Sequence, residues 1–317
     1  MKYMNDLIPK YTTEITTSST ELFNKMIERF TEFVDVSEIS MKSYRTGIKK
    51  FIVFLNEQGI TNPTRETIVE YKKSLCQKYS SNTIGLYLSS IRKFFTWLES
   101  EGLYQNITSG VKSPKISHEH KRDAFSASEL KTIVANMKHD TVQELRDYAI
   151  FTLIASCGLR TIEVTRANVG DIHSVMGVTV LDIQGKGHSA KDSFVKLSDP
   201  VLKAITEYLS ARGAVADDEP LFASCSRRNK GGRLTTRTIS AVCKKAMKTA
   251  GFDSKRLTAH SLRHSAVTLA LLAGMSLDDV SQFARHSSVG VTMIYNHAVS
   301  RIKSACEATV SNAIFGR

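Results

Sequence analysis

Apolar residues recur at helical spacing along most of the chain, and this periodicity limits the possible folds more than any other feature of the sequence. Four periodic segments precede residue 105, and they span residues 18–33, 40–58, 64–75 and 81–101. Gly59 and Gly102 follow the second and fourth segments, as helix-ending glycines do. Helices of this length joined by short loops form a small bundle, so we predict a four-helix domain over residues 18–104.

A change in composition divides the 317 residues, which are enough for two domains with separate cores. Residues 105–124 are polar, basic and poor in large apolar side chains, and we interpret them as a linker between the domains. Residues 1–17 show little periodicity, so we expect a flexible N-terminal arm there. A solvated linker explains His118 and His120, because no further metal ligand lies near them in the sequence.

The second domain, over residues 125–317, is predicted to be mostly helical with a small antiparallel β-sheet. Ser126 and Glu129 form a capping box, which indicates the start of a helix. Residues 177–184 and 193–197 have the pattern of two strands joined by a turn. The predicted fold class is therefore mainly α, with the four-helix bundle preceding this domain.

The formal net charge of the chain is +12 at pH 7. Such an excess of positive charge favours a polyanionic partner such as nucleic acid. Five basic residues of the second and fourth predicted helices are candidates for contact with phosphates: Lys42, Arg45, Lys49, Arg92 and Lys93. The alternative is that these side chains are only solvated, as basic residues on an outer helix face usually are.

Several common cofactor and metal sites are missing from the sequence. There is no GxxxxGKS/T loop for ATP and no GxGxxG after a predicted strand. The carboxylates form no DxD pattern for magnesium, and Ser261 stands where a zinc motif built on His260 and His264 needs its glutamate. An enzyme with this sequence is expected to need no metal and no other cofactor.

The sequence favours a cytoplasmic protein. It has no run of eighteen apolar residues, so we expect no membrane span, and its first residues lack the apolar core of a signal peptide. The five cysteines are odd in number and include no CxxC pair. We interpret them as free thiols in a reducing compartment.

Four short segments carry residue types that suit chemistry on a phosphate. They are Gly158–Glu163 with Arg160, Gly185–Gly187 with Lys186, His260–His264 with Arg263, and His286 followed by Tyr295. Taken singly, each has an ordinary explanation: a helix salt bridge, a hairpin tip, a chance pair on one helix face, and a packing tyrosine. Their occurrence together, in this order, points to a shared site.

In that order the four segments resemble the tyrosine recombinase (phage integrase) family, of the Xer and integrase type. That family carries Gly-Leu-Arg with a following glutamate, a hairpin lysine, His-x-Leu-Arg-His, a second histidine and then a tyrosine. The resemblance covers residues 125–300, and the bundle over 18–104 is similar, less specifically, to the family's core DNA-binding domain. One departure is visible, because Arg285 stands where the family usually has a glycine before the second histidine.

The resemblance implies that residues 125–317 form the catalytic domain of a site-specific DNA recombinase, for integration and excision or for resolution. It implies six catalytic residues, which are Arg160, Lys186, His260, Arg263, His286 and Tyr295. Tyr295 would attack a phosphodiester and form a covalent 3′-phosphotyrosine, which stores the bond energy for rejoining without ATP. Arg160 and Arg263 would clamp the non-bridging oxygens with their bidentate forks.

The remaining residues fit the proton transfers that such a reaction needs. A tyrosine hydroxyl has an ordinary pKa of about 10, so His260 would assist by accepting its proton. Lys186 would give a proton to the leaving 5′ oxygen, and His286 would donate a hydrogen bond to the phosphate. Glu163 would hold Arg160 or its helix in place.

The resemblance also implies double-stranded DNA as the partner and association with the nucleoid. The free protein would be a monomer or weak oligomer that forms a homo-tetramer on two DNA sites, with accessory DNA-bending proteins as candidate helpers. Residues 302–317 would dock on a neighbouring protomer through their apolar side chains, whose alternative is packing within their own chain. Two other functions stay open: a type IB-like topoisomerase or resolvase with the same chemistry, and a catalytically idle DNA-binding regulator.

Overall fold

A computed structural model describes residues 17–115, 124–185, 187–286, 288, 290–293, 295, 299–300 and 304–316. Lys186, almost all of the expected N-terminal arm and residues 116–123 of the expected linker lie outside the described residues. The chain forms two compact units, Met1–His118 and Glu119–Arg317.

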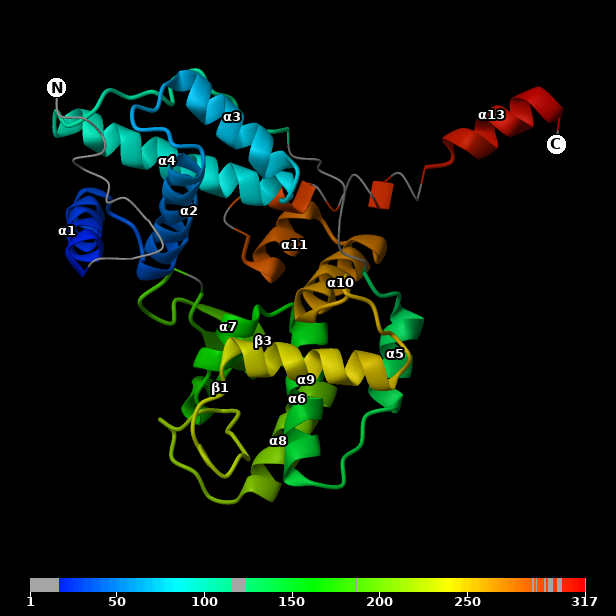
Figure 1. Cartoon of the computed structure of the whole chain (residues 1–317). Coiled ribbons are helices and arrows are strands. Elements are labelled where there is room, and N and C mark those ends of the chain that lie inside the picture. Colours follow the sequence, from blue (N-terminus) through cyan, green and yellow to red (C-terminus); the bar gives the residue numbers. More distant parts are fainter. Residues whose placement is uncertain are drawn as a thin grey trace. The chain divides into compact units, whose positions relative to one another are not determined.

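The first unit contains the four predicted helices, and the mainly α fold class is confirmed (Figure 1). They are α1 (Thr17–Phe33), α2 (Glu38–Glu57), α3 (Arg65–Cys76) and α4 (Ser81–Ser100). α2 and α4 pack closely because Gly47 has no side chain: a Cβ there would lie 2.7 Å from Ser90 Oγ. Rings of Phe30, Phe94 and Trp97 fill the core between α1 and α4.

The second unit is mostly helical around one small sheet. Its elements are α5 (Ala127–Ala135), α6 (Val142–Cys157), α7 (Thr161–Arg166), η2 (Val169–Asp171), β1 (Ile172–Val175), β2 (Val178–Ile183), β3 (Ser193–Lys196), α8 (Asp199–Arg212), α9 (Thr236–Thr249), α10 (Ala259–Leu272), α11 (Leu277–Ala284) and α13 (Cys306–Phe315). The expected capping box at the start of α5 is present, with Ser126 N–H donating to Glu129 Oε2 at 2.7 Å.

The sheet is antiparallel with strand order β1-β2-β3, and Leu181 of β2 pairs with both Ile172 and Val195. The sequence pattern predicted β2 and β3 but not β1. β1 has only four residues, of which three are exposed, so it offers no apolar alternation to detect. As a short edge strand, it needs little burial of its own.

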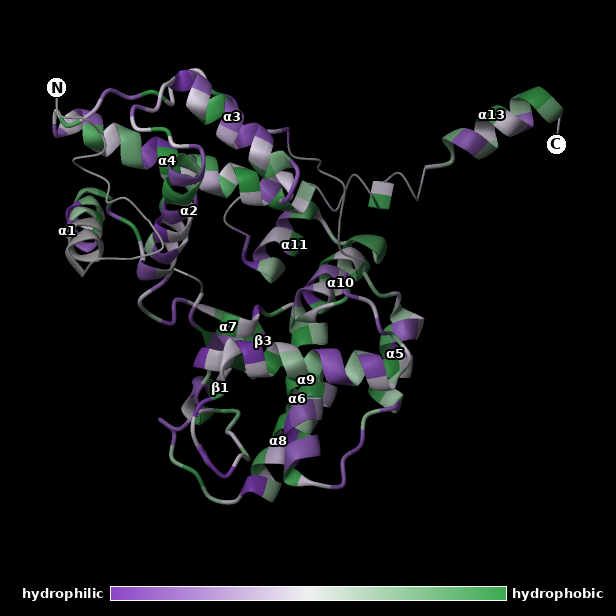
Figure 2. Ribbon diagram, in the orientation of Figure 1, coloured by the Kyte–Doolittle hydropathy of each residue, from purple (hydrophilic) through white to green (hydrophobic). Residues whose placement is uncertain are grey.

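α6 is the central helix of the second unit, and it contacts α8, α9 and α10. Its residues Ile150, Phe151, Leu153 and Ile154 are fully buried although they point in different directions around the helix. α9 instead alternates hydrophilic and hydrophobic residues along its length in Figure 2, and only one of its faces is buried. Because α6 is buried on all sides, the loop that follows it begins at a fixed position in the second unit. Among the described helices, none is long and apolar enough to cross a membrane.

Candidate active site

The break between α6 and α7 positions Arg160. Gly158 ends α6 in the left-handed conformation, with φ of 60°, and a Cβ there would approach the Phe283 ring to 3.1 Å. Arg160 directly precedes α7, and about a third of its side chain (32%) stays exposed. Its Nη2 donates to the carbonyl of Arg285 at 3.2 Å. The sequence therefore turns at Gly158 and presents Arg160 next to the segment after α11.

Glu163 is completely buried and is the anion of this cluster. Its Oε1 accepts a hydrogen bond from Arg160 Nη1 at 2.9 Å, and its Oε2 accepts from the Arg160 backbone N–H at 2.7 Å. Oε2 also accepts from Arg285 Nη2 at 3.1 Å. A buried carboxylate is tolerated only when it is paired, and here two guanidinium groups pair with it.

Arg263 lies on α10 with only 1% of its surface exposed. Its Nη1 donates to the carbonyl of Gly158 at 2.6 Å, and its Nη2 donates to the carbonyl of Ala284. Burial lowers the pKa of Arg263 to about 10, helped by the nearby charges of Arg160 and Arg285. The side chain still carries its charge at neutral pH, and it joins the ends of α6 and α11 to α10.

Two histidine rings lie next to the Tyr295 ring, and a third lies next to one of them. The ring of His264 lies 5.0 Å from that of Tyr295, and the ring of His260 lies 4.5 Å from that of His264. His286 stacks on Tyr295 with 6.0 Å between ring centroids and 17° between planes. His264 belongs to the His-x-Leu-Arg-His motif but is not among the six expected catalytic residues, yet its ring is nearer to that of Tyr295 than the ring of His286 is.

His286 is held by a hydrogen bond between its Nδ1 and Thr292 Oγ1, 2.8 Å apart. Burial lowers the pKa of His286 to about 4, and the charges of Arg263, Arg160, Arg285 and His260 add to that effect. The ring is therefore neutral at pH 7. A neutral imidazole whose Nδ1 accepts from Thr292 would keep a donor on Nε2.

The surroundings of Tyr295 agree with both interpretations of this residue, a packing tyrosine and a member of the active site. It is only 7% exposed, and it packs in an apolar cluster with Val267, Leu271, Val280, Ala284 and Val299. It also interacts electrostatically with Arg263, which partly offsets the lowering of the Arg263 pKa by burial. The ring is thus a packing residue whose surroundings are cationic and rich in imidazole.

Arg285 is the functional candidate that sequence reasoning missed, although its replacement of a glycine was visible. Its backbone is left-handed, with φ of 52°, which explains why a glycine suits this position. Its guanidinium contacts Glu163 and the carbonyls of Gly158 and Phe283. No local sequence pattern indicates these contacts, because Glu163 and Arg285 are far apart along the chain.

Lys186 lies outside the described residues, so the structure leaves its position open. Its neighbour Gly185 follows shortly after the end of β2. The carbonyl of Gly185 accepts a hydrogen bond from Arg166 Nη1 at 2.7 Å. Arg166 is the last residue of α7. The base of the β2–β3 turn is therefore tied to the helix that Arg160 precedes.

Within the described ranges, no group of three or more His, Cys, Asp or Glu side chains is placed to hold a metal ion. The cluster around Arg160 instead gathers guanidinium groups, imidazoles and a phenol. Such groups donate hydrogen bonds to anionic oxygens and exchange protons, so the cluster suits chemistry on a phosphodiester.

The candidate phosphate contacts of the first unit are of two kinds. Lys42, Arg45 and Lys49 are exposed along α2, and Lys93 is exposed on α4. Arg92 instead donates to the carbonyl of Val111 at 2.7 Å and to Ser113 Oγ at 3.1 Å. Three of the five basic side chains thus form an open row on one helix, whereas Arg92 holds the chain that follows α4.

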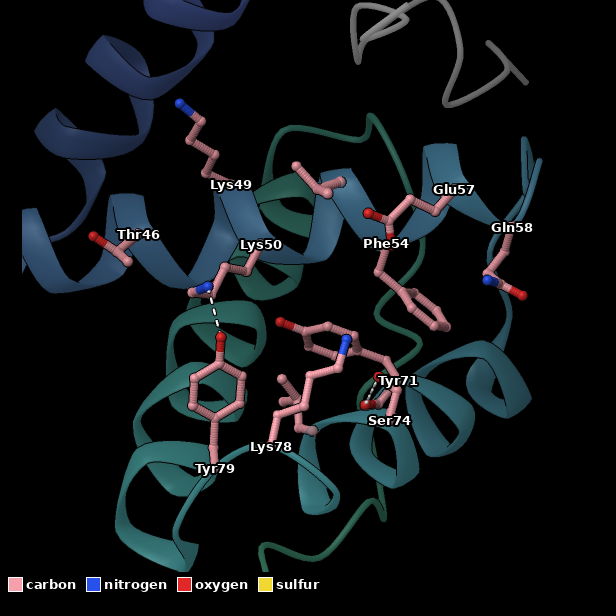
Figure 3. Close-up of a pocket in the computed structure, with 12 residues that line it drawn as sticks. Thr46, Lys49, Lys50, Phe54, Glu57, Gln58, Tyr71, Ser74, Lys78 and Tyr79 are labelled. Carbon is pink, nitrogen blue, oxygen red and sulfur yellow. Dashed lines mark hydrogen bonds between the residues drawn. The ribbon is translucent and has the colours of Figure 1, made fainter.

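A cavity of about 570 Å³ lies between α2 and α3 of the first unit (Figure 3). Lys50 donates to the hydroxyl of Tyr79 at 2.8 Å across one side of it, while Lys49 points away from both. The hydroxyl of Tyr71 is buried without a hydrogen-bond partner. The cavity contains none of the six residues of the predicted active site.

Residues 124–301 match the model of the phage integrase family, and residues 27–102 match that of the phage integrase N-terminal SAM-like domain. One relative is the tyrosine recombinase XerC of Caldanaerobacter subterraneus, 33% identical over 215 residues, which are 66% of this chain and 57% of the relative. XerC of Herpetosiphon aurantiacus is 26% identical over 91% of this chain and 97% of its own length.

The fold is also found among solved structures. The crystal structure of XerH site-specific recombinase bound to palindromic difH substrate, a post-cleavage complex, has a TM-score of 0.73 and covers 92% of this chain and 84% of its own. A lambda integrase tetramer bound to a Holliday junction has a TM-score of 0.64 and covers 90% of this chain and 82% of its own. At 19% and 15% sequence identity to this chain, these two structures show that it shares their fold.

Proposed function

The chain belongs to the phage integrase family of tyrosine recombinases, and from this premise we propose that it cuts and rejoins DNA at specific sites with Tyr295 as the nucleophile. One observation supports this proposal above the others. Arg160 donates to the carbonyl of Arg285, Arg263 donates to the carbonyl of Ala284, and His286 follows directly. Two guanidinium groups and an imidazole therefore meet at one turn, beside the Tyr295 ring.

In the proposed reaction, the Tyr295 oxygen attacks the phosphorus of a DNA phosphodiester. A bond forms between that oxygen and phosphorus, the bond to the 5′ oxygen breaks, and a 3′-phosphotyrosine remains. Negative charge grows on the non-bridging oxygens meanwhile. Arg160 and Arg263 each make two side-chain hydrogen bonds to the described part of the chain, and a guanidinium has five N–H donors, so both keep donors for those oxygens.

Three further residues are assigned to proton transfer or to a hydrogen bond with the phosphate. We assign to His260 the acceptance of the Tyr295 proton, because the His264 ring is next to both the His260 ring and the Tyr295 ring. His286 donates to the phosphate, as a neutral ring whose pKa of about 4 keeps it unprotonated at pH 7. Lys186 gives the proton that the leaving 5′ oxygen needs, from a turn whose base is tied to α7.

The same proposal gives the first unit the task of holding duplex DNA. The exposed row of Lys42, Arg45 and Lys49 supports it, because cations at helical spacing can follow one strand of phosphates. Relatives in this fold include structures that contain DNA, and the net charge of +12 agrees with such a partner. We place the protein in the cytoplasm, at the nucleoid, where such a partner is found.

We extend the proposal to a homo-tetramer on two DNA sites, which accessory DNA-bending proteins can help to assemble. All described side chains of α13 are exposed or nearly so, including Val310, Ile314 and Phe315 at 57%, 66% and 74%. Three large apolar side chains on one short helix favour a partner surface. The proposed surface belongs to a neighbouring copy of the chain.

The test begins with DNA recovered with the protein from cells, since the target sequence is needed for a substrate. Two copies of the recovered site are then placed on one plasmid and incubated with the protein in EDTA. We expect recombinant products that join the two sites. Relaxation of supercoils without joining would favour a topoisomerase, and tight binding without any covalent adduct would favour a DNA-binding regulator.

A further inference from the structure

Arg285 has a backbone conformation that its side chain makes costly. Its φ of 52° and ψ of 51° lie in the left-handed region, where a Cβ crowds the backbone and glycine is preferred. Among the described non-glycine residues, only Met176 and Arg285 have a positive φ. Met176 is a fully exposed residue of a β-turn, whereas Arg285 is at the candidate active site. A strained residue at a functional site calls for a reason in its side chain.

The side chain of Arg285 is anchored on the chain that presents Arg160. It is 13% exposed. Its Nη1 donates to the carbonyl of Phe283 at 2.6 Å. Its Nη2 lies 3.1 Å from Glu163 Oε2 and 3.3 Å from the carbonyl of Gly158. The guanidinium therefore spans from the end of α11 to both sides of the α6–α7 break.

The ion pair between Arg285 and Glu163 changes the net charge around Arg160. With Arg160 alone, the buried Glu163 carboxylate would neutralise the positive charge that Arg160 brings to a phosphate. With Arg285 as a second partner, the three groups carry a net charge of +1. A glycine at position 285, as is usual in the family, would leave Arg160 and Glu163 as a neutral pair.

We propose that Arg285 is a positioning residue for strand cleavage: it shares the Glu163 carboxylate with Arg160, and so leaves Arg160 both oriented and charged for the scissile phosphate. The inference rests on the proposed function. Arg285 itself acts through Glu163, and the chemistry stays with Arg160. The contacts of the Arg285 side chain thus offset the strain of its left-handed backbone.

A second effect of the same charge reaches His286. The ring faces Arg263, Arg160, Arg285 and His260, and it stacks on Tyr295. Glu163 forms ion pairs with two of these arginines, Arg160 and Arg285. Burial is the main cause of the low His286 pKa, and Arg285 is one of several charges that add to it, so its removal should raise that pKa somewhat above about 4.

The experiment compares Arg285→Gly with Met176→Gly, which relaxes the same backbone conformation at an exposed turn away from the cluster. Each protein is assayed for covalent adduct on a nicked site, for DNA affinity, and for the His286 pKa by NMR. We expect Arg285→Gly to lose about ten- to a hundredfold in adduct formation with DNA affinity little changed. Met176→Gly should match the wild-type protein. Arg285→Lys, which keeps the charge without the fork, should recover part of the rate.

The outcomes separate two failures. If the wild-type protein forms no adduct on its recovered site, the proposed function is wrong, and this inference with it. If the wild-type protein forms the adduct and Arg285→Gly forms it equally fast, only the inference is wrong. The same holds if the Arg285→Gly protein is slow but Arg285→Lys recovers none of the lost rate, because lost charge is then not the cause.

Discussion

Arg160 and Arg263 are used differently by the protein, and a lysine at each position separates charge from geometry. Arg160 keeps a third of its side chain exposed, whereas Arg263 is buried and donates to two backbone carbonyls. We expect Arg160→Lys to bind DNA almost normally but to lose about a hundredfold or more in cleavage, because a lysine lacks the fork. The cleavage rate on a nicked substrate measures this effect.

Arg263→Lys should lose cleavage to a similar extent and should also be less stable. A lysine cannot donate to both carbonyls as the fork does. The Gly158 carbonyl also accepts from Arg285, so the expected loss is at the buried Ala284 carbonyl, at a cost of about 1–3 kcal/mol in the free energy of unfolding. Denaturant unfolding of both variants checks the difference. Near-normal cleavage by either lysine variant would mean that the phosphate clamp lies elsewhere.

At this scale, helical spacing was enough to predict some neighbours but not others. His260 and Arg263 were expected on one helix face, and both lie on α10. The contact of Arg285 with Glu163 could not be predicted, because it depends on how the ends of α6 and α11 meet. The same is true of the hydrogen bond between His286 and the hydroxyl of Thr292.

Whole elements were predictable where a long apolar pattern exists. The four helices of the first unit, β2 and β3 follow from periodicity, with glycines after α2 and α4. β1 was missed because three of its four residues are exposed. The exposure of α13 could not be predicted from its pattern either, since the helix has apolar side chains but buries none of them among the described residues.

α13 gives a prediction at the scale of an element. Removal of residues 304–317 deletes Val310, Ile314 and Phe315, which are exposed and which we assign to the contact with a neighbouring protomer. We expect binding to one DNA site to be kept and joining of two sites to be lost, because only the joining needs the assembly. Gel shifts and a two-site plasmid assay measure the two activities.

The matched control for this truncation is Asn312→Ala, which changes a polar residue of α13 and leaves its apolar side chains in place. The control should recombine normally, while replacement of Ile314 and Phe315 by serine should behave like the truncation. Two-site joining at the normal rate by the truncated protein would contradict a role of α13 in assembly.

At the scale of the molecule, the net charge of +12 predicts that DNA binding depends steeply on salt. If about six phosphates are neutralised, the affinity should fall roughly a thousandfold between 50 and 200 mM salt. Lys49→Ala removes an exposed cation of α2, and the salt slope should decrease by about one. Arg92→Ala should change the slope less, because Arg92 donates to Val111 and Ser113. A salt profile that is flat would contradict a phosphate-binding bundle.

The central claim is that Tyr295 is the nucleophile, and mapping of the covalent adduct tests it most directly. Tyr295→Phe removes one oxygen from a ring that is 7% exposed and packs among apolar residues, so folding and DNA binding should stay nearly unchanged. Tyr208→Phe is the control, since this buried tyrosine of the same unit binds the backbone N–H of Ala223. We predict that mass spectrometry finds the nucleotide on the peptide containing Tyr295, and that only Tyr295→Phe abolishes the adduct. An adduct formed by Tyr295→Phe, or a nucleotide on another residue, would contradict the account.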